Sequence, residues 1–442
     1  MRAVLESLPV TQEPPAGMKV GIIGLGYVGL PLATAFAESG ADVVGLDSDA
    51  TKVAAVTAGR SYIEDVPEAT LARLVASGRL RATSDAPHLA DREAILICLP
   101  TPLDEHRHPD LSFVVAGASV AVEQLAPGAL LVLESTTWPG TTREVIAPLL
   151  EDQGRRIGED CFLAFSPERV DPGNTRWGIR DTPKVVGGLT PACSERARAL
   201  YASVCDTVHV VSSPESAELA KILENTYRAV NIALVNELAI LADRMGIDVW
   251  EAIGAAATKP FGYMPFWPGP GLGGHCIPVD PFYLAWRARA FDLDSEFVEL
   301  AGRINVNMPY YAVSRIARAL NGRAKPLRDA AILLLGVAYK PDVGDMRESP
   351  SLKLRELLAA QGAHVTYHDP HVPMLPDGDS SRELTAESLA QADCVVIATA
   401  HSALDLALVV DRADLVVDLR NAVRQRLGGG PAGPLPPNVD VL

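Results

Sequence analysis

Residues 19–29 of this 442-residue chain read KVGIIGLGYVG, a short apolar run that ends in three glycines with GxGxxG spacing. An apolar helix is predicted from Leu30 to about Ser39, and a second strand is predicted at 42–47. A GxGxxG motif that lies between a strand and a helix, followed by a second strand, is the fingerprint of a dinucleotide-binding fold. This stretch fits that reading better than the alternative of a glycine turn in an unrelated α/β unit.

Each glycine of the fingerprint has its own task. Gly24 allows the tight turn, Gly26 lets the backbone approach a pyrophosphate, and Gly29 lets the helix pack closely on the strand. The N-terminus of the helix attracts phosphate. Asp47 follows near the offset expected for a carboxylate that binds the ribose hydroxyls, which favours NAD over NADP.

Further apolar strands follow, separated by helical stretches, and this alternation predicts a mostly parallel, doubly wound sheet. These strands are expected at 93–99, 129–134, 161–165 and 185–186. Ligands of such sheets bind beyond the carboxyl ends of the strands. Three loops fall there, namely Pro-Thr-Pro at 100–102, Ser-Thr-Thr at 135–137 and Ser-Pro-Glu-Arg at 166–169.

Apolar residues at mixed three- and four-residue spacings predict a long helix over 214–245. A second α/β unit begins at 330–336 and lacks a second GxGxxG. Its first loop, 337–349, offers Lys340 and Arg347, so it could hold phosphates through side chains. The predicted fold class is α/β, with two Rossmann-like doubly wound domains joined by a long central helix and a helical region.

The bulk composition excludes several classes of function. A net charge of −16 argues against a nucleic-acid partner, because phosphate binding needs a basic surface. No apolar run approaches the roughly 18 to 20 residues of a membrane helix, and the start of the chain lacks the features of a signal peptide. The six cysteines show no metal-ligand or disulfide spacing, so no metal is expected and the location is read as cytoplasmic.

Cys276 stands out from the other cysteines because it follows a glycine-rich stretch, Pro268–His275, and precedes Asp280. A thiolate can trap an aldehyde as a hemithioacetal and prepare it for a second hydride transfer. An enzyme that only oxidises an alcohol has no use for such a thiol. In isolation, a lone cysteine is more often a small packing residue.

Lys221 and Asn225 lie four residues apart on the predicted long helix, and Arg228 follows on the same face. A lysine and an asparagine side by side can stabilise an alkoxide or a tetrahedral oxyanion. The alternative is a solvated helical face, which the neighbouring Glu218 and Glu224 would suit.

Four other candidate site residues also have an ordinary structural interpretation. Asp280 could cap an element, His275 could be a satisfied core histidine, and Arg169 and Arg347 could be ordinary surface charges.

Taken together, the motifs resemble the nucleotide-sugar 6-dehydrogenase family, which includes the UDP-glucose, GDP-mannose and UDP-N-acetylhexosamine dehydrogenases. The resemblance covers residues 19 to about 424. It rests on the GxGxxG, Pro-Thr-Pro, Ser-Thr-Thr, Pro-Glu-Arg, Lys-x3-Asn, Gly-Gly-His-Cys and Lys-x6-Arg-Glu-Ser segments in this order.

The resemblance implies a four-electron oxidation of a sugar C6 from alcohol to carboxylate, with two NAD+ and water. It also implies a division into a disordered leader (1–17), an NAD-binding Rossmann domain (18–213), a central helical domain for dimerisation and the active site (214–322), and a C-terminal UDP-binding Rossmann-like domain (323–442). The expected partners are a UDP-sugar and a second copy of the chain, without nucleic acid or membrane.

Site residues follow from the same resemblance. The implied catalytic group contains the nucleophile Cys276, the oxyanion pair Lys221 and Asn225, the base Asp280, and the water-positioning Thr136 and Glu168. The implied NAD contacts are Gly24, Gly26, Tyr27, Val28, Gly29, Asp47, Thr101, Thr136 and Arg347. The implied substrate contacts are Glu168, Arg169, Val170, Lys221, Asn225, Arg228, Gly273 and Lys340.

The sequence around Cys276 also bears on the sugar. Gly-Gly-His-Cys-Ile-Pro-Val-Asp resembles the N-acetylhexosamine branch of the family, and Pro278 together with the segment 259–267 is most similar to the UDP-N-acetylglucosamine 6-dehydrogenases of surface polysaccharide synthesis. UDP-N-acetylmannosamine and UDP-glucose remain alternative substrates. Two other classes stay open, a single-step hydroxyacid dehydrogenase and a non-enzymatic dinucleotide-sensing protein, but neither needs Cys276.

Overall fold

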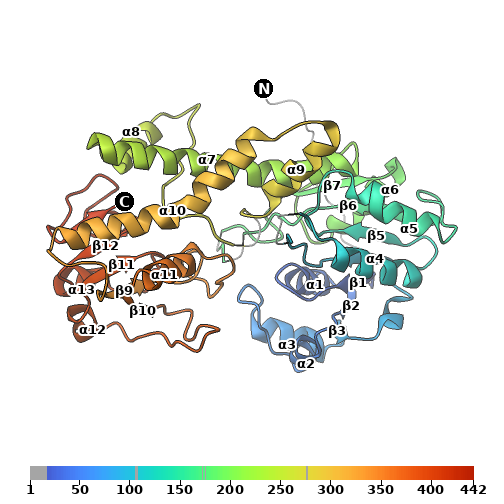
Figure 1. Cartoon of the computed structure of the whole chain (residues 1–442). Helices are drawn as coiled ribbons and strands as arrows, with labels where there is room; N and C mark the ends of the chain where they lie inside the picture. Colours follow the sequence, from blue (N-terminus) through green and yellow to red (C-terminus); the bar gives the residue numbers. More distant parts are fainter. Residues whose placement is uncertain (1–16, 105–107, 172, 175, 275–276) are drawn as a thin grey trace. The chain divides into compact units, whose positions relative to one another are not determined.

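The structure, a computed structural model, describes residues 17–104, 108–171, 173–174, 176–274 and 277–442. These residues form two compact units. The first unit runs up to Glu224 and includes Phe282–Leu293, and the second contains Asn225–Pro281 and Asp294–Leu442. Each unit holds its own doubly wound sheet (Figure 1), which confirms the predicted fold class. The predicted leader lies outside the described residues except for Gly17.

The sheet of the first unit has eight strands in the order β3-β2-β1-β4-β5-β6-β7-β8. All neighbouring strands pair in parallel except β6 and β7, which are antiparallel. The strands are β1 Lys19–Ile23, β2 Asp42–Leu46, β3 Leu80–Thr83, β4 Ala94–Ile97, β5 Leu130–Leu133, β6 Phe162–Phe165, β7 Lys184–Gly188 and β8 Val208–Val211.

The central strands of this sheet are apolar throughout because both of their faces are covered. Every residue of β4, β5 and β6 is buried. Such uninterrupted runs made these strands predictable from sequence. The edge strands β3 and β8 are partly exposed and were not predicted, since they carry no continuous apolar run.

Helices connect the strands of the first unit. They are α1 Gly29–Glu38, α2 Ala50–Thr57, α3 Glu68–Ala76, α4 Ser112–Gln124, α5 Ala147–Glu151 and α6 Pro191–Tyr201, with the short turns η1 Ala86–Leu89 and η2 Thr142–Ile146. After α1 the chain reverses at Gly40, whose φ of 102° suits glycine. Helix α9, Asp280–Ala288, and η3, Arg289–Phe291, return to this unit from Phe282 onward.

The second unit has a five-stranded, wholly parallel sheet in the order β10-β9-β11-β12-β13. Its strands are β9 Ala331–Leu335, β10 His364–His368, β11 Cys394–Ile397, β12 Val416–Asp418 and β13 Val439–Val441. Its connecting helices are α11 Pro350–Ala360, α12 Ala386–Ala390, α13 Leu406–Arg412 and α14 Ala422–Leu427. Strands β10 and β11 lie on opposite sides of β9, so the strand order changes direction there. Sheets of this kind commonly bind ligands beyond the carboxyl ends of the strands at such a point.

Helices α7, α8 and α10 are the remaining helices of the described residues. Helix α7, Pro214–Met245, has 32 residues and confirms the predicted long helix. Helices α8, Val249–Ala257, and α10, Glu296–Asn321, belong to the second unit. Among the described residues, no helix is long and apolar enough to cross a membrane.

Candidate functional site

The glycine turn after β1 has the geometry that close phosphate binding requires. Gly24 has φ 94°, and a Cβ there would lie 2.5 Å from the Cys98 carbonyl oxygen. A Cβ on Gly29 would lie 1.8 Å from the carbonyl oxygen of Gly24, so helix and turn can meet only without a side chain. At Gly26, in contrast, a Cβ would meet no described atom within 4 Å. The turn is therefore closed on the protein side and open at Gly26, where a pyrophosphate can approach.

Asp47 follows β2 directly and faces this turn. Its carboxylate accepts hydrogen bonds from the N–H groups of Leu25 at 2.8 Å and Asp49 at 2.9 Å, and Lys52 Nζ lies 3.5 Å away. These contacts fix the carboxylate at the end of the strand. Its remaining lone pairs can accept hydrogen bonds from a ribose, as predicted for an NAD-type cofactor. The residues present therefore fit a bound dinucleotide.

The loops after β4 and β5 are tied to each other. Ser135 Oγ donates to the Leu99 carbonyl at 2.7 Å and accepts the Leu99 N–H at 3.0 Å. Thr101 accepts a hydrogen bond from Tyr283 Oη at its carbonyl, at 2.7 Å. Thr136 is half-buried in the same loop region. The two predicted site residues Thr101 and Thr136 thus lie on connected loops at the carboxyl ends of parallel strands.

The Pro-Glu-Arg segment after β6 makes local contacts. Glu168 Oε1 accepts the N–H groups of Arg169 at 2.7 Å and Val170 at 2.5 Å. Arg169 donates to Glu224 at 2.6 Å and to the Pro183 carbonyl at 2.5 Å. Arg169 is therefore not a plain surface charge, because its guanidinium links this loop to helix α7.

Helix α7 carries buried polar residues around the predicted oxyanion pair. Lys221 is 9% exposed, Asn225 is 5% exposed and Glu218 is completely buried, so this part of the helix is not a solvated face. Glu218 accepts hydrogen bonds from the Gly140 N–H at 2.6 Å, the Thr142 N–H at 2.9 Å and Thr142 Oγ1 at 2.7 Å. Burial raises the pKa of Glu218 to about 7 despite these bonds. The burial of Glu218 was not predicted, because a glutamate close to a lysine is typical of a solvated helical face.

The second unit brings two of the predicted catalytic residues together. Asn225 Nδ2 donates to Asp280 Oδ2 at 2.5 Å, and both side chains are buried. Asp280 is the first residue of α9. Its predicted neighbours His275 and Cys276 lie outside the described residues. A buried amide that points its N–H at a buried carboxylate fixes that carboxylate as a hydrogen-bond acceptor, which suits a base.

The glycine-rich stretch before Cys276 lies against the first loop of the second sheet. A Cβ on Gly273 would lie 2.6 Å from Tyr339 Cβ, and the Gly274 N–H donates to the Arg347 carbonyl at 3.0 Å. Further back, the Gly269 N–H donates to the buried Asn236 Oδ1 at 3.0 Å. The predicted substrate contact Gly273 is thus in contact with the loop that carries Lys340.

The three remaining cationic candidates lie at different places in the second unit. The Arg347 guanidinium pairs with Asp345 at 2.6 Å. Lys340 Nζ lies 5.8 Å from the centre of the Tyr339 ring. Arg228 is exposed on α7. Tyr27 and Val28, in the first unit, stand at the start of α1, and Tyr27 is 41% exposed. The structure leaves the ligand contacts of these five residues as predictions.

Three models of one protein family match most of the chain. The UDP-glucose/GDP-mannose dehydrogenase family matches with its NAD binding domain at residues 18–205, its central domain at 215–307 and its UDP binding domain at 333–425.

Two characterised relatives show comparable identity. The chain is 36% identical over 390 residues to the UDP-N-acetyl-D-glucosamine 6-dehydrogenase of Pseudomonas aeruginosa, covering 87% of this chain and 91% of that protein. It is 37% identical over 386 residues to the UDP-N-acetyl-D-mannosamine dehydrogenase of Pyrococcus horikoshii, covering 87% and 90%. A solved structure of UDP-D-ManNAc dehydrogenase from Pyrococcus horikoshii superposes with a TM-score of 0.85 at 33% identity, covering 92% of this chain and 96% of that one.

Proposed function

Because the chain belongs to the UDP-glucose/GDP-mannose dehydrogenase family, we propose that it oxidises UDP-N-acetyl-D-glucosamine at C6 to the uronic acid, for surface polysaccharide synthesis. The chain is an NAD-dependent UDP-sugar dehydrogenase of the UDP-N-acetylhexosamine type. The sugar epimer, the catalytic residues and the assembly are the proposed parts.

The observation that carries the mechanism is the buried hydrogen bond between Asn225 and Asp280. Asp280 lies four residues after Cys276 in the sequence, so the fixed carboxylate accompanies the proposed nucleophile. Asp280 accepts the alcohol proton through water while C6 loses its first hydride. When bound, NAD+ accepts the hydride in each of the two oxidation steps. Lys221 and Asn225 stabilise the oxygen that becomes negatively charged.

The Cys276 thiolate then adds to the carbonyl carbon of the aldehyde, and the oxygen takes up a proton to give a hemithioacetal. Loss of the second hydride and the hydroxyl proton leaves a thioester on Cys276. Thr136 and Glu168 position the water that cleaves this thioester, releasing the carboxylate and the thiol. Arg169, Val170, Arg228, Gly273 and Lys340 hold the nucleotide sugar.

The other cysteines are poor candidates for the nucleophile. All five described cysteines are buried and free. Burial raises the pKa of Cys161 to about 11 and that of Cys205 to about 12, and it raises the pKa values of Cys98 and Cys394 as well. A thiol must ionise to attack a carbonyl, so these four raised pKa values make the thiols poor nucleophiles at neutral pH. Free thiols also favour a reducing compartment, which supports our proposal of a cytoplasmic location.

The gluco epimer rests on the sequence around Cys276. The Gly-Gly-His-Cys segment resembles the N-acetylhexosamine branch, and Pro278 with the segment 259–267 is most similar to the N-acetylglucosamine enzymes. The relatives do not separate the epimers, because the N-acetylglucosamine and N-acetylmannosamine enzymes are 36% and 37% identical to this chain. UDP-N-acetyl-D-mannosamine is therefore the second candidate substrate.

The decisive experiment is the stoichiometry of NADH with UDP-N-acetylglucosamine, UDP-N-acetylmannosamine, UDP-N-acetylgalactosamine and UDP-glucose, each supplied in limiting amount. We expect two NADH per UDP-N-acetylglucosamine, and we expect Cys276→Ser to lose acid formation. One NADH per sugar would indicate a single-step dehydrogenase. Undiminished acid formation by Cys276→Ser would refute the thioester route, and two NADH from only another sugar would correct the epimer.

We further propose that α7 contributes to a homodimer. Five exposed apolar residues recur at heptad-like spacing on the part of α7 in the second unit, namely Tyr227, Leu234, Leu238, Leu241 and Met245. Their exposed fractions run from 43% to 61%. Light scattering should give the mass of a dimer for the wild type and for Glu237→Gln, a control at an exposed polar position, and of a monomer for Leu238→Glu with Leu241→Glu. A wild-type monomer would refute the proposal.

A further inference from the structure

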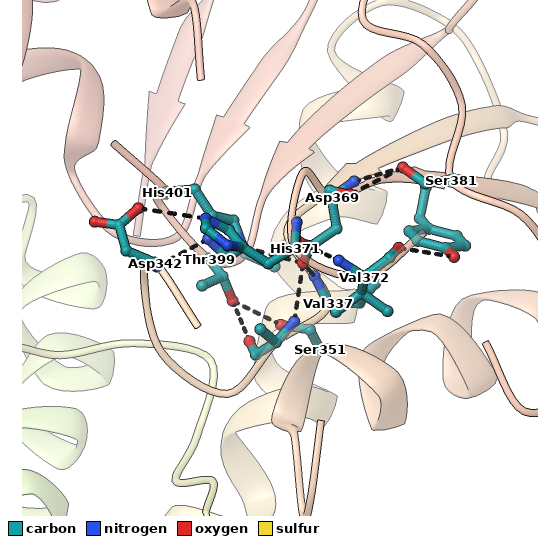
Figure 2. Close-up of polar contacts among 12 residues, drawn as sticks. Val337, Asp342, Ser351, Asp369, His371, Val372, Ser381, Thr399 and His401 are labelled. Carbon is teal, nitrogen blue, oxygen red and sulfur yellow. Dashed lines mark hydrogen bonds and ion pairs between the residues drawn. The ribbon is translucent and has the colours of Figure 1, made fainter. Parts of the chain in front are cut away.

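A buried acid, Asp369, lies at the carboxyl ends of β9, β10 and β11 (Figure 2). Asp369 follows β10 directly, and its side chain is completely buried. Oδ2 accepts the N–H groups of Val337 at 2.7 Å and Ala338 at 3.1 Å. Oδ1 accepts those of His371 at 2.8 Å and Val372 at 3.1 Å. Asp369 therefore fixes the start of the loop that runs from β9 to α11.

His401 completes this arrangement from the loop after β11. Its ring is fully buried, with Nε2 3.0 Å from Asp369 Oδ2. Nδ1 accepts the backbone N–H of Asp342 at 3.0 Å. A nitrogen that accepts an N–H carries no proton, so Nε2 bears the proton and donates to Asp369. Both ring nitrogens are thus used, each with a defined role.

The same contacts argue against a metal ion here. Ligand atoms of Asp342, His371 and His401 lie within 4.8 Å of one another, which is close enough to suggest a cation site. A metal would need a free lone pair on His401, but the Asp342 N–H occupies the lone pair of Nδ1 and Nε2 carries the proton. The cluster is therefore a hydrogen-bonded network.

This network holds the loop at a second point, two residues beyond Lys340. Asp342 has φ 61°, an unfavourable conformation for a residue other than glycine. Its N–H is held by His401, and its Oδ1 accepts the Ser402 N–H at 2.7 Å and Ser402 Oγ at 2.9 Å. Thr399 Oγ1 donates to the Ala338 carbonyl at 2.6 Å. The segment 337–342 is thus pinned on both sides of Lys340.

We propose that His401 and Asp369 are positioning residues for UDP-sugar binding, which hold Lys340 in place by fixing the backbone of residues 337–342. This inference rests on the proposed function, in which Lys340 contacts the nucleotide sugar. Neither residue touches the substrate in this account. Both act through the backbone of the loop.

Two substitutions of His401 separate its two hydrogen bonds. Gln can keep the donor to Asp369 but loses the acceptor for the Asp342 N–H, whereas Asn can keep that acceptor but loses the donor. Loss of one buried hydrogen bond corresponds to roughly a fivefold to thirtyfold change in an equilibrium constant. We expect His401→Gln to raise KM for the UDP-sugar and Kd for UDP by about that factor. We expect His401→Asn to raise them less.

Three further readouts distinguish positioning from general stability. In both variants kcat and Kd for NAD+ should stay within about twofold of wild type, because one lost hydrogen bond in the second unit leaves the cofactor turn intact. His364→Gln, the same change at an exposed position at the opposite end of β10, should leave KM unchanged. A lower melting temperature in both His401 variants with unchanged KM and Kd for UDP would overturn the inference.

Lys340→Ala separates this inference from the proposed function. If Lys340→Ala raises Kd for UDP and His401→Gln does not, the inference fails and the proposed substrate contact stands. If His401→Gln raises it and Lys340→Ala does not, the network positions the loop but Lys340 is not the contact. If neither variant changes Kd for UDP, the positioning inference and the proposed contact of Lys340 with the substrate are both wrong.

Discussion

The two sheets of this chain begin with the same geometry. In the first unit Gly24 follows β1 directly, and its N–H donates to the carbonyl of Leu46, the residue before Asp47, at 2.8 Å. In the second unit Gly336 follows β9 directly, and its N–H donates to the carbonyl of His368, the residue before Asp369, at 2.9 Å. Both glycines have positive φ, 94° and 82°. Each unit therefore places an aspartate beside a glycine turn at the end of the neighbouring strand.

The difference lies in what each aspartate holds. Asp47 accepts two backbone N–H groups and leaves lone pairs available, and α1 begins five residues after Gly24. Asp369 is enclosed by four N–H groups and His401, and α11 begins only at Pro350, after a long loop. The first turn can present its own backbone to a phosphate. At the second turn, the Asp369 carboxylate is already surrounded by N–H groups of the protein and by His401. A ligand there would meet the side chains of the following loop instead.

This contrast explains how one architecture can serve two ligands. An open turn of glycines suits a pyrophosphate that approaches the backbone. The loop after β9 is held by the buried Asp369, and such a fixed loop can bind a ligand through side chains such as Lys340. The family comparison agrees with this division, because its NAD binding domain matches the first sheet and its UDP binding domain the second.

The largest expected effects come from the glycines. A Cβ at Gly24 would lie 2.5 Å from the Cys98 carbonyl oxygen, and one at Gly336 would lie 2.3 Å from the Thr399 carbonyl oxygen. We expect Gly24→Ala and Gly336→Ala each to cost at least about 3 kcal/mol of unfolding free energy. Hydrogen exchange should locate the loss in the unit that carries the substitution. Gly26→Ala, where a Cβ has room, should keep its stability and weaken NAD+ binding; equal losses in all three would refute the geometry.

Asp369→Asn tests the closed turn. The amide would face N–H donors with its own N–H2 group, so we expect a loss of about 3 kcal/mol in urea unfolding. Asp47→Asn, in the open turn, should cost less than about 1 kcal/mol. Similar losses for the two variants would show that the second turn is no more closed than the first.

Buried acids of the two units should give opposite pH dependences. Burial raises the pKa of Glu218 from 4.5 to about 7, so its contribution to stability is complete below pH 4.5 and is lost as the pH rises through 7. Burial alone would raise the pKa of Asp369, but hydrogen bonds from His401 and Val337 lower it from 3.8 to about 2. Its contribution is complete above pH 4 and is lost as the pH falls through 2.

Urea unfolding between pH 4.5 and pH 8 checks this prediction. The wild type should lose about 3 kcal/mol over this range through Glu218, and Glu218→Gln should flatten the slope. If the unfolding free energy of Glu218→Gln changes with pH as in wild type, other groups cause the pH dependence. Asp369→Asn should leave the slope in this range as in wild type.

The smallest expected effect is a change in the affinity for NAD+ in Asp47→Asn. Asp47→Asn removes a charged acceptor for the ribose, and we expect Kd for NAD+ to rise about tenfold. Fluorescence titration with NAD+ and with NADP+ measures the change. The preference for NAD+ over NADP+ should also narrow, since the carboxylate no longer repels a 2′-phosphate.

Sequence alone predicted the fold because its signals are local. The GxGxxG turn, the buried strands and the 32-residue helix are each visible within one segment. Edge strands such as β13 were missed because a short, half-exposed strand has no distinctive pattern.

The site was only partly predictable for the same reason. Helical spacing indicated Lys221 and Asn225, but the contact of Asn225 with Asp280 joins residues 55 positions apart. The Asp369–His401 contact spans 32 positions. Comparing the two halves could have revealed Asp369, since both second strands are followed directly by an aspartate.

The central claim is that each turn serves a different ligand. NAD+ binds at the open glycine turn after β1, and UDP binds at the loop that follows the closed turn after β9. Calorimetric titration of NAD+ and UDP into wild type, Asp47→Asn and Lys340→Ala tests it most directly. We predict that Asp47→Asn weakens NAD+ about tenfold and leaves UDP within about twofold, and that Lys340→Ala does the reverse. Loss of both ligands in either variant, or loss of NAD+ in Lys340→Ala, would contradict the account.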